Sequence, residues 1–154
     1  MKRRIYLGGY YVIVLLCVFS FFPATGEPAE SIKMLDLSPQ SGVMKDVGDR
    51  NQMGVRFAVE EINAAGGLLG RPVKMFFDDS QVKPDVATRK AMRYIMEEKV
   101  EFLLTSTGTH VAKALEPVAD KNKVILLNYA ASGDELTGKD FTPYHFRMCL
   151  STAQ

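Results

Sequence analysis

The chain has 154 residues, of which 47% are hydrophobic and 24% are charged. These values are typical of an ordinary globular domain, and they exclude a disordered tail, a collagen-like fibre and a polytopic membrane protein. A formal charge of +1 gives no reason to expect a nucleic-acid partner, and two cysteines are too few for a disulfide scaffold.

The N-terminal segment has the three-part layout of a secretory signal peptide. Basic residues at positions 2–4 precede an uncharged and mainly apolar run, Ile5–Phe22, and the small residues Ala24 and Gly26 follow it. We expect cleavage after Gly26, which makes residues 1–26 the signal peptide. Cleavage would remove three of the 19 basic residues and none of the 18 acidic ones. The remaining chain is then mildly acidic and has no electrostatic reason to bind DNA or anionic lipid.

Two other interpretations of this segment stay open. The first is an uncleaved anchor, because Ile5–Phe22 just reaches the ~18 apolar residues of a membrane helix. A glycine pair within the run and the small residues at its end favour cleavage. The second is a lipoprotein signal acylated at Cys17, which the bulky Leu16 disfavours. If Cys17 is removed with the signal peptide, Cys149 is a lone thiol. We interpret Cys149 as a small hydrophobic residue.

The first predicted elements are a strand and a helix. The apolar run at 32–37 predicts a strand that ends at a Ser-Pro pair, and a loop is expected from Ser41 to about Gly48. Apolar residues then recur at three- and four-residue steps, which predicts a helix with apolar positions at Met53, Phe57, Ala58, Ile62 and Ala65. The pair Gly66-Gly67 should end this helix, because glycine adopts the left-handed cap without steric cost.

Two further strand–helix pairs follow. After a strand at 73–77, Pro84 marks a helix start, because its missing N–H costs nothing in the first turn. This helix should bury a stripe made of Ala87, Ala91, Tyr94 and Ile95. A strand at 100–104 leads to a third helix, whose apolar residues are Val111, Leu115 and Val118. Pro117 should kink or divide that helix.

The alternation of elements, completed by strands at 124–127 and 144–147, predicts an α/β fold with a parallel sheet and helices on both faces. In the flavodoxin-like order 2-1-3-4, the winding reverses between strands one and three, and ligands bind beyond the carboxyl ends at this switch point. Three loops should meet there: Ser38–Gly48, Thr105–His110 and Asn128–Gly133. Their small and hydroxyl-bearing residues indicate a small polar ligand.

Two stretches also resemble a known family: IKMLDLSPQSG from residue 32, and VRFAVEEINAAGGLLGRPVKMFFDDSQVKPDVATRKA from residue 55. Both are similar to the start of the periplasmic branched-chain amino-acid binding proteins. These are the leucine/isoleucine/valine-type receptors of ABC importers, with the type I periplasmic binding fold. The similarity continues through VEFLLTSTGTHVAKALEPVADKNKV and ELTGKDFTPYHFR, and it covers nearly all of residues 31–154.

The resemblance implies a two-lobed protein, of which residues 27–154 supply part of the N-terminal lobe while the second lobe is absent from this sequence. Its function would be to bind a branched-chain or related amino acid, an amide or an aromatic acid, and to deliver it to the ABC transporter permease in the inner membrane. The implied location is the periplasm, and no cofactor or metal is implied. Two alternatives stay open: a ligand-sensing module of the same fold, and a truncated remnant without binding activity.

The resemblance also implies the ligand contacts of the first lobe, which hold the α-carboxylate and α-ammonium groups. On this sequence they fall on Thr107, Thr109, His110, Ala130, Ala131 and Ser132. Ser41 begins a loop, 41–47, that would form one wall. The N-terminus of the third helix suits a carboxylate, because its N–H groups are unpaired and carry a partial positive charge. Other family members often have serines where this sequence has Thr-Gly-Thr-His.

These residues also have simpler structural interpretations. Thr109 is a candidate N-cap of the third helix, His110 a solvent-facing residue of its first turn, and Ser132 an ordinary turn residue. The adjacent acids Asp78 and Asp79 point to opposite faces of a strand, so we interpret them as strand-end and turn residues rather than as a metal site.

No enzyme is indicated by the sequence. It contains no G-x-S-x-G nucleophile elbow, no H-E-x-x-H, and no G-x-G-x-x-G after the first strand. A Cys–His pair built from Cys149 with His110 or His145 is disfavoured, because a few such residues easily come together by chance. The chain is therefore interpreted as part of a non-catalytic binding protein, and its open strand edges and helix-packing face are expected to favour aggregation.

Overall fold

The computed structural model describes residues 30–106 and 108–152, so the expected signal peptide at 1–26 lies outside the described residues. The strands are β1 (Ile32–Asp36), β2 (Val73–Phe77), β3 (Phe102–Thr105), β4 (Ile125–Asn128) and β5 (His145–Arg147). The helices are α2 (Lys45–Ala64), α3 (Pro84–Glu97) and α4 (Thr109–Asn122), with short 3-10 turns η1 (Gly42–Met44) and η2 (Asp134–Leu136). None of the helices in these two ranges is long and apolar enough to span a membrane.

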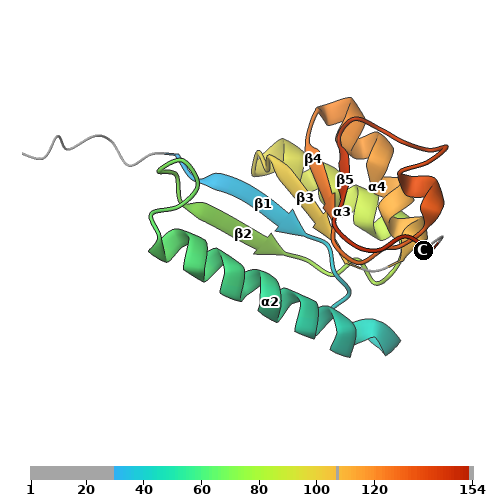
Figure 1. The fold of residues 1–154 in the computed structure, drawn as a ribbon, viewed down its shortest axis with the longest axis horizontal. Coiled ribbons are helices and arrows are strands. Elements are labelled where there is room, and N and C mark those ends of the chain that lie inside the picture. Colours follow the sequence, from blue (N-terminus) through green and yellow to red (C-terminus); the bar gives the residue numbers. More distant parts are fainter. Residues whose placement is uncertain (1–29, 107, 153–154) are drawn as a thin grey trace, which may run out of the picture.

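The strands form one parallel sheet in the order β2-β1-β3-β4-β5 (Figure 1). The predicted α/β class, strand order and short fifth strand are confirmed. Two strand boundaries differ from the prediction by one or two residues: β1 ends at Asp36, and β3 begins at Phe102. Val100 stays outside β3 because its N–H is directed at the carbonyl of Tyr94, where it closes the end of α3. The winding reverses between β1 and β3, as expected.

The main core lies between the sheet and the helices α3 and α4. Leu35, Leu103 and Leu126 project from neighbouring strands and are fully buried against this helix pair. The predicted stripe of α3 is confirmed, with Ala87, Ala91 and Ile95 buried and Tyr94 half-buried in contact with this core. Alternating side chains on a strand point to opposite faces, so the residues between these leucines face the other side.

Helix α2 covers that other side (Figure 1). Two neighbouring residues of β2 show that the sheet is packed on both faces. Phe76 packs on Tyr94 of α3, with ring centroids 5.3 Å apart, whereas the ring of Phe77 lies under the guanidinium of Arg56 on α2, 3.8 Å away. The sheet therefore has helices on both faces, as the sequence predicts.

Helix α2 differs from the prediction at its start and on its apolar face. It begins at Lys45, so the expected loop as far as Gly48 is wrong; Gly48 lies inside the first turn, directly against the backbone of Pro39. The predicted apolar residues are not buried either: Met53 is 66% exposed and Phe57 is 61% exposed. Because α2 meets the sheet along β2, much of its apolar face stays open. This agrees with the expected open helix-packing face.

Glycine and proline set the other helix boundaries. Helix α2 ends at Ala64, and both Gly66 and Gly67 follow with positive φ, which confirms the predicted stop. Pro84 is the first residue of α3, also as predicted. Of the two effects expected of Pro117, a kink or a division, the division is wrong, because α4 runs through it as one helix. Pro117 is on the exposed side of α4, where water can bond the carbonyl that loses its partner.

A buried histidine–glutamate pair fixes the edge strand β5 to α4. His145 Nδ1 lies 2.7 Å from Oε1 of Glu116, and both side chains are almost completely buried. Burial raises the pKa of Glu116 from 4.5 to about 7, and burial lowers the pKa of His145 from 6.5. Both shifts favour the uncharged forms, in which a protonated carboxyl of Glu116 would donate to a neutral imidazole of His145.

This pair gives opposed pH effects that a Glu116→Gln variant should separate. The raised pKa of Glu116 contributes stability below pH 4.5 that is lost as the pH rises through about 7. The lowered pKa of His145 contributes stability above pH 6.5 that is lost on acidification. In the wild type, the pH dependence of stability that comes from Glu116 and the one that comes from His145 have opposite signs, so they offset each other between pH 4.5 and about 7. We expect the Tm of Glu116→Gln to fall more steeply than the wild-type Tm from pH 6.5 to 5, because only the histidine slope remains.

The matched control for this experiment is Glu97→Gln, an exposed acid at the end of α3. It should leave the shape of the Tm–pH curve unchanged. Parallel curves for the wild type and Glu116→Gln would contradict the assignment of a shared proton to this pair.

Candidate functional site

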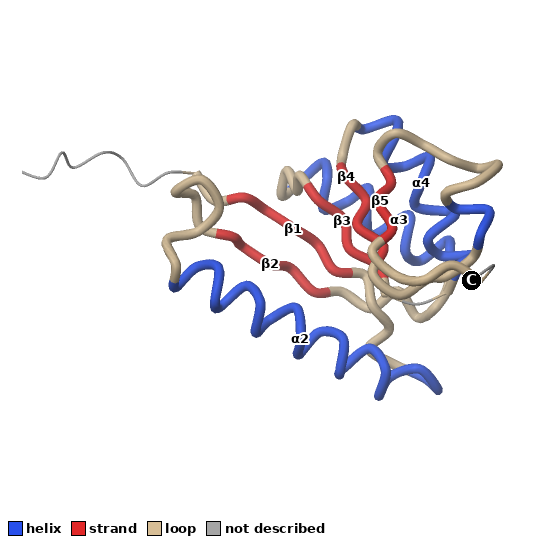
Figure 2. Tube along the Cα trace, viewed as in Figure 1, coloured by secondary structure: helices blue, strands red, loops and turns tan. Residues whose placement is uncertain are grey.

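The carboxyl ends of the parallel strands lie at one end of the sheet, and the loops that follow them gather there (Figure 2). The loop after β3 leads into α4, whose first residues are Thr109 and His110. Gly133, in the loop after β4, donates its N–H to Oγ1 of Thr109 across 3.2 Å. This bond joins the loop after β4 to the start of α4. Thr107 lies outside the described residues.

Thr109 is not the N-cap of α4, which corrects one structural interpretation. The cap position is Gly108, with φ of 81°, and Thr109 is the first helical residue. A φ of this sign is strained for residues other than glycine, so Gly108 sets the direction in which the helix begins. Oγ1 of Thr109 accepts in its bond with Gly133, so that bond does not use the hydroxyl proton of Thr109.

A buried amide shapes the loop after β4. Asn128 is the last residue of β4 and is fully buried. Its Oδ1 accepts from the N–H of Ala131 at 2.8 Å and from the N–H of Ala130 at 3.3 Å, while its Nδ2 donates to the carbonyl of Ala131 at 2.7 Å. Cys149 Sγ, half-buried and free, also donates to the carbonyl of Ala131 at 3.3 Å. Of the two expected alanine carbonyls, that of Ala131 is therefore already occupied.

Ser132 lies beside this loop and is partly exposed. Its backbone carbonyl accepts from the N–H of Thr152 at 3.0 Å, and the next carbonyl, that of Gly133, accepts from Nη1 of Arg147 at 3.0 Å. These bonds fix the backbone of Ser132 and of Gly133, the residue that contacts Thr109. The structure thus brings Thr109, Ala130, Ala131 and Ser132 together.

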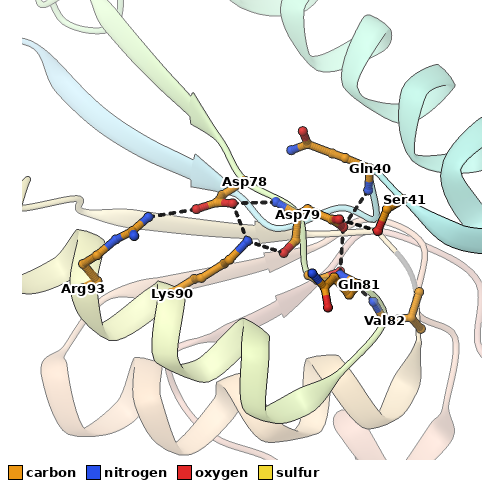
Figure 3. A network of polar contacts seen from close by, with 9 residues as sticks. Gln40, Ser41, Asp78, Asp79, Gln81, Val82, Lys90 and Arg93 are labelled. Atoms are coloured by element: carbon orange, nitrogen blue, oxygen red, sulfur yellow. Dashed lines mark hydrogen bonds and ion pairs between the residues drawn. The ribbon is translucent and has the colours of Figure 1, made fainter.

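Ser41 and His110 each contact the loop after β2, and Figure 3 shows the contact of Ser41. Ser41 is exposed, and its hydroxyl donates to Oδ2 of Asp79 at 2.5 Å. His110 is exposed in the first turn of α4, and its Nε2 lies 3.0 Å from the carbonyl oxygen of Val82. Both residues therefore contact the segment between β2 and α3, whereas Ala130, Ala131 and Ser132 follow β4 and Thr109 contacts that loop through Gly133.

The two adjacent acids have separate structural partners, as Figure 3 shows. Asp78 forms ion pairs with Lys90 at 2.6 Å and Arg93 at 3.0 Å, both on α3. Asp79 accepts from the N–H groups of Gln40 and Gln81, each at 2.8 Å, in addition to Ser41. Although burial opposes it, these hydrogen bonds leave the pKa of the Asp79 carboxyl lowered. They hold the loops after β1 and β2 together.

A buried polar cluster that the sequence interpretation missed lies at the switch point. It consists of Asp36, Ser38, Ser106 and Tyr129, and we call it the Asp36 cluster. Asp36 Oδ1 accepts from the N–H of Ser38 at 2.8 Å and from its hydroxyl at 2.5 Å, and Oδ2 accepts from the Tyr129 hydroxyl at 3.0 Å. Ser106 also hydrogen-bonds to Tyr129. An aspartate at the end of a mainly apolar strand was the available signal for Asp36, but it did not indicate Tyr129 as its partner.

Two of the chemical alternatives can be examined within residues 30–106 and 108–152: a metal site and a Cys–His pair. No cluster of three or more His, Cys, Asp or Glu residues there is arranged to hold a metal. The Cys–His pair weighed for Cys149 is not formed, because His145 pairs with Glu116 and the thiol of Cys149 is directed at Ala131. The polar groups at the strand ends are hydroxyls, backbone groups and one buried carboxylate, which are groups that bind a small polar molecule.

Comparison with known proteins agrees with this arrangement. Residues 31–154 match the family model described as periplasmic binding protein. A Leu/Ile/Val-binding protein homologue of Brucella abortus is 31% identical over 127 residues, which are 82% of this chain and 32% of that protein. The chain therefore spans about a third of the length of the curated relatives it matches.

Two solved structures show the same fold. One is the branched-chain amino acid transporter substrate binding protein LivJ from Streptococcus pneumoniae in complex with isoleucine. Its TM-score is 0.73 at 26% identity, covering 79% of this chain and 34% of that one. The other is a solute binding protein of an ABC transporter from R. palustris in complex with benzoate, with a TM-score of 0.70 at 25% identity, covering 79% of this chain and 33% of that one.

The predicted resemblance is confirmed by the family match, the sequence relatives and the shared fold together. The chain belongs to the periplasmic binding protein family, and it carries part of a type I periplasmic binding fold similar to the Leu/Ile/Val-binding proteins.

Proposed function

We propose that this chain supplies the first-lobe half of the ligand site in a solute-binding protein of an ABC importer. The ligand would be a branched-chain or related amino acid, an amide or an aromatic acid. The observation that carries the proposal is the hydrogen bond from Gly133 to Thr109, which joins the start of α4 and the loop after β4 beside the switch point. The names of the relatives support the ligand classes, since one binds isoleucine and another benzoate.

The ligand carboxylate fits the start of α4. The first N–H groups of a helix have no intrahelical partner, and the helix dipole contributes ~0.3–1 kcal/mol for an exposed anion and up to ~2 when partly buried. The hydroxyl proton of Thr109 is available to this carboxylate, and Ser132 offers a second hydroxyl. A hydrogen bond to a charged group is worth about 1.5–3 kcal/mol.

An ammonium group fits the loop after β4. The carbonyl of Ala131 already accepts from Asn128 and Cys149, so both its lone pairs have donors. The backbone carbonyl of the exposed Ala130 is therefore the better acceptor for the ammonium group. Of the two alanines that the resemblance suggested, we prefer Ala130. Ser41 and His110 would serve the site indirectly, by holding the wall formed with the loop after β2.

Ligand capture and delivery would depend on hinge closure between two lobes. A ligand docked on the first lobe is buried when a second lobe closes over it, and the closed form is the one that a permease would recognise. Export through the N-terminal signal peptide would place the protein in the periplasm. The permease in the inner membrane is then the protein partner.

The test is calorimetry on the full-length product of the gene, titrated with leucine, isoleucine, valine and benzoate. We expect one of them to bind with a Kd in the micromolar range, about 8 kcal/mol. Ser132→Ala should weaken that ligand about tenfold or more, because a hydrogen bond to its charged group is lost.

The matched control is Thr88→Ala, whose hydroxyl bonds only within its own helix α3. It should leave the Kd unchanged. Equal affinity of Ser132→Ala and the wild type would contradict the placement of the ligand, and the absence of binding to any ligand in a wider screen would contradict the function.

A further inference from the structure

Helix α2 contacts the sheet along one side only. Gly48 and Gln52 are buried and Val55 and Val59 are half-buried, and these residues mark the side that faces the sheet. Figure 1 shows α2 as the outermost layer on its side of the sheet. The opposite side of the helix is exposed, and we call it the outer face of α2. It consists of Arg50, Met53, Gly54, Phe57, Ala58 and Glu61.

The middle of the outer face is apolar and uneven. Met53 is 66% exposed and Phe57 is 61% exposed. Gly54 has no side chain, and a Cβ added to it would have no heavy atom within 4 Å. Met53 and Phe57 therefore project beside a hollow at Gly54. A second helix can pack closely on such a surface if it places a large side chain in the hollow.

Opposite charges lie at the two ends of this apolar patch. Arg50 lies one turn before it and Glu61 one turn after it, and both are exposed. Neither residue forms an ion pair within the part of the chain that the structure describes. Both charges are therefore available to pair with groups of another molecule.

The outer face is complementary to itself when a second copy runs in the opposite direction. If a two-fold axis passes through the midpoint of this face, residues equally far from the midpoint face each other. The facing pairs are Phe57 with Gly54, Met53 with Ala58 and Arg50 with Glu61. In the first two pairs a large side chain meets a small residue, and in the third a cation meets an anion. Each pair forms twice, because a two-fold interface repeats every contact.

Other arrangements of the two helices lose this complementarity. In a parallel two-fold pair each residue faces its own counterpart, so Arg50 meets Arg50 and Glu61 meets Glu61. An antiparallel pair displaced by one turn brings Asp46 opposite Glu61, or, displaced the other way, leaves Arg50 opposite Ala65. Like charges that face each other across an interface are strongly unfavourable. The charges thus select one direction and one register.

We propose that the outer face of α2 binds a second copy of this chain, as an antiparallel pair of helices related by a two-fold axis. Val43 before α2 and Leu69 after it are both fully exposed, and antiparallel pairing brings Val43 of one copy to the same end as Leu69 of the other. One helix from each copy makes a small interface, so we expect a reversible dimer with a Kd in the micromolar range. The inference does not depend on the proposed function, because no residue of the candidate ligand site takes part.

The test is analytical ultracentrifugation of the full-length protein over a range of concentrations. The wild type should shift from monomer to dimer as the concentration rises. Arg50→Glu should weaken the dimer about tenfold or more, because it replaces two attractions by two repulsions. Adding Glu61→Arg to Arg50→Glu should restore most of the association, since each charge again meets its opposite. The matched control is Arg89→Glu, an exposed arginine of α3 on the other face of the sheet, which should leave the Kd unchanged.

Gly54→Leu separates association from folding. A Cβ at this position meets no heavy atom of its own chain, and leucine favours a helix more than glycine does. The Tm measured at low protein concentration should therefore not fall. The leucine side chain occupies the hollow that receives Phe57 of the other copy, so the dimer should weaken about tenfold or more.

Chemical labelling distinguishes a second copy from a later segment of the same polypeptide. Ala58→Cys provides a thiol on the outer face, whose reaction with iodoacetamide is followed at that position by mass spectrometry. The reaction should be fast in dilute protein and slow in concentrated protein. Protection at every dilution would show that the same polypeptide covers the face, and it would overturn the inference. A wild type that stays monomeric would also overturn it, as would a dimer that neither Arg50→Glu nor Gly54→Leu weakens.

Discussion

Gly48→Ala is expected to destabilise the protein by about 3 kcal/mol, at the upper end of what overpacking in a folded interior costs. Gly48 lies in the first turn of α2, and a Cβ added there would fall 1.6 Å from the carbonyl oxygen of Pro39 and 2.7 Å from its carbonyl carbon. Both are backbone atoms, so no side-chain rotation can relieve the clash. Either α2 or the segment after β1 has to move.

The same movement should weaken ligand binding. The residues that follow Pro39 are Gln40 and Ser41, which fix the wall of the crevice through Asp79. A shift of this segment changes the direction in which the chain leaves β1, close to the Asp36 cluster. Urea unfolding gives the loss in stability, and calorimetry gives the loss in affinity.

The control is a second glycine of the same helix. A Cβ at Gly54 has no heavy atom within 4 Å, so Gly54→Ala should stabilise the protein by about 0.5–1 kcal/mol through helix propensity. If the two substitutions shift the unfolding midpoint equally, the close contact with Pro39 is not present in solution.

The fold was predictable because its signals are local. Apolar runs of four to six residues, the glycine pair after α2 and Pro84 at the start of α3 each mark an element within a few positions of the chain. The alternation of strands and helices then leaves few topologies. Where prediction failed, the cause was not visible in the local pattern: Gly48 packs against Pro39, nine positions earlier, and the predicted apolar stripe of α2 is left exposed.

The candidate site was predictable only in part, for the same reason. The rule that loops beyond parallel strands meet predicts the two loops, while Thr109 and Ser132 were named from the family resemblance; the structure joins the two loops through Gly133 and Thr109. The contact between Asp36 and Tyr129 joins residues 93 positions apart, and nothing in either neighbourhood indicates it. The bonds of Asn128 span only two or three residues, but they depend on a loop conformation that composition does not specify.

Asn128→Asp is expected to disrupt the loop after β4 and to lower stability by about 3 kcal/mol or more at neutral pH. One carboxylate oxygen can still accept from the N–H of Ala131, but the other replaces a donor 2.7 Å from the carbonyl oxygen of Ala131. Two acceptors then face each other at a fully buried position, where an unpaired acceptor is costly. Binding should be lost as well, because Ala130 and Ser132 follow the distorted turn.

The effect of acid on Asn128→Asp distinguishes repulsion between two buried acceptors from simple loss of packing. In the folded variant the carboxyl at position 128 is buried against an acceptor, which raises its pKa above the unfolded value. Its stability is therefore greatest below the unfolded pKa and falls as the pH rises through the folded one. When protonated, the carboxyl regains a donor for the carbonyl of Ala131, so Asn128→Asp should approach the wild-type Tm as the pH falls toward 4.

Asn128→Ala provides the comparison, since it leaves the N–H and the carbonyl of Ala131 without the amide at every pH. It should lose about 1–3 kcal/mol for each group left unpaired, with no recovery in acid relative to the wild type. The measurement is the Tm of the wild type, Asn128→Asp and Asn128→Ala from thermal melts between pH 4 and 8. If Asn128→Asp and Asn128→Ala keep a constant Tm difference across that range, the amide of Asn128 is not what holds the binding loop in place.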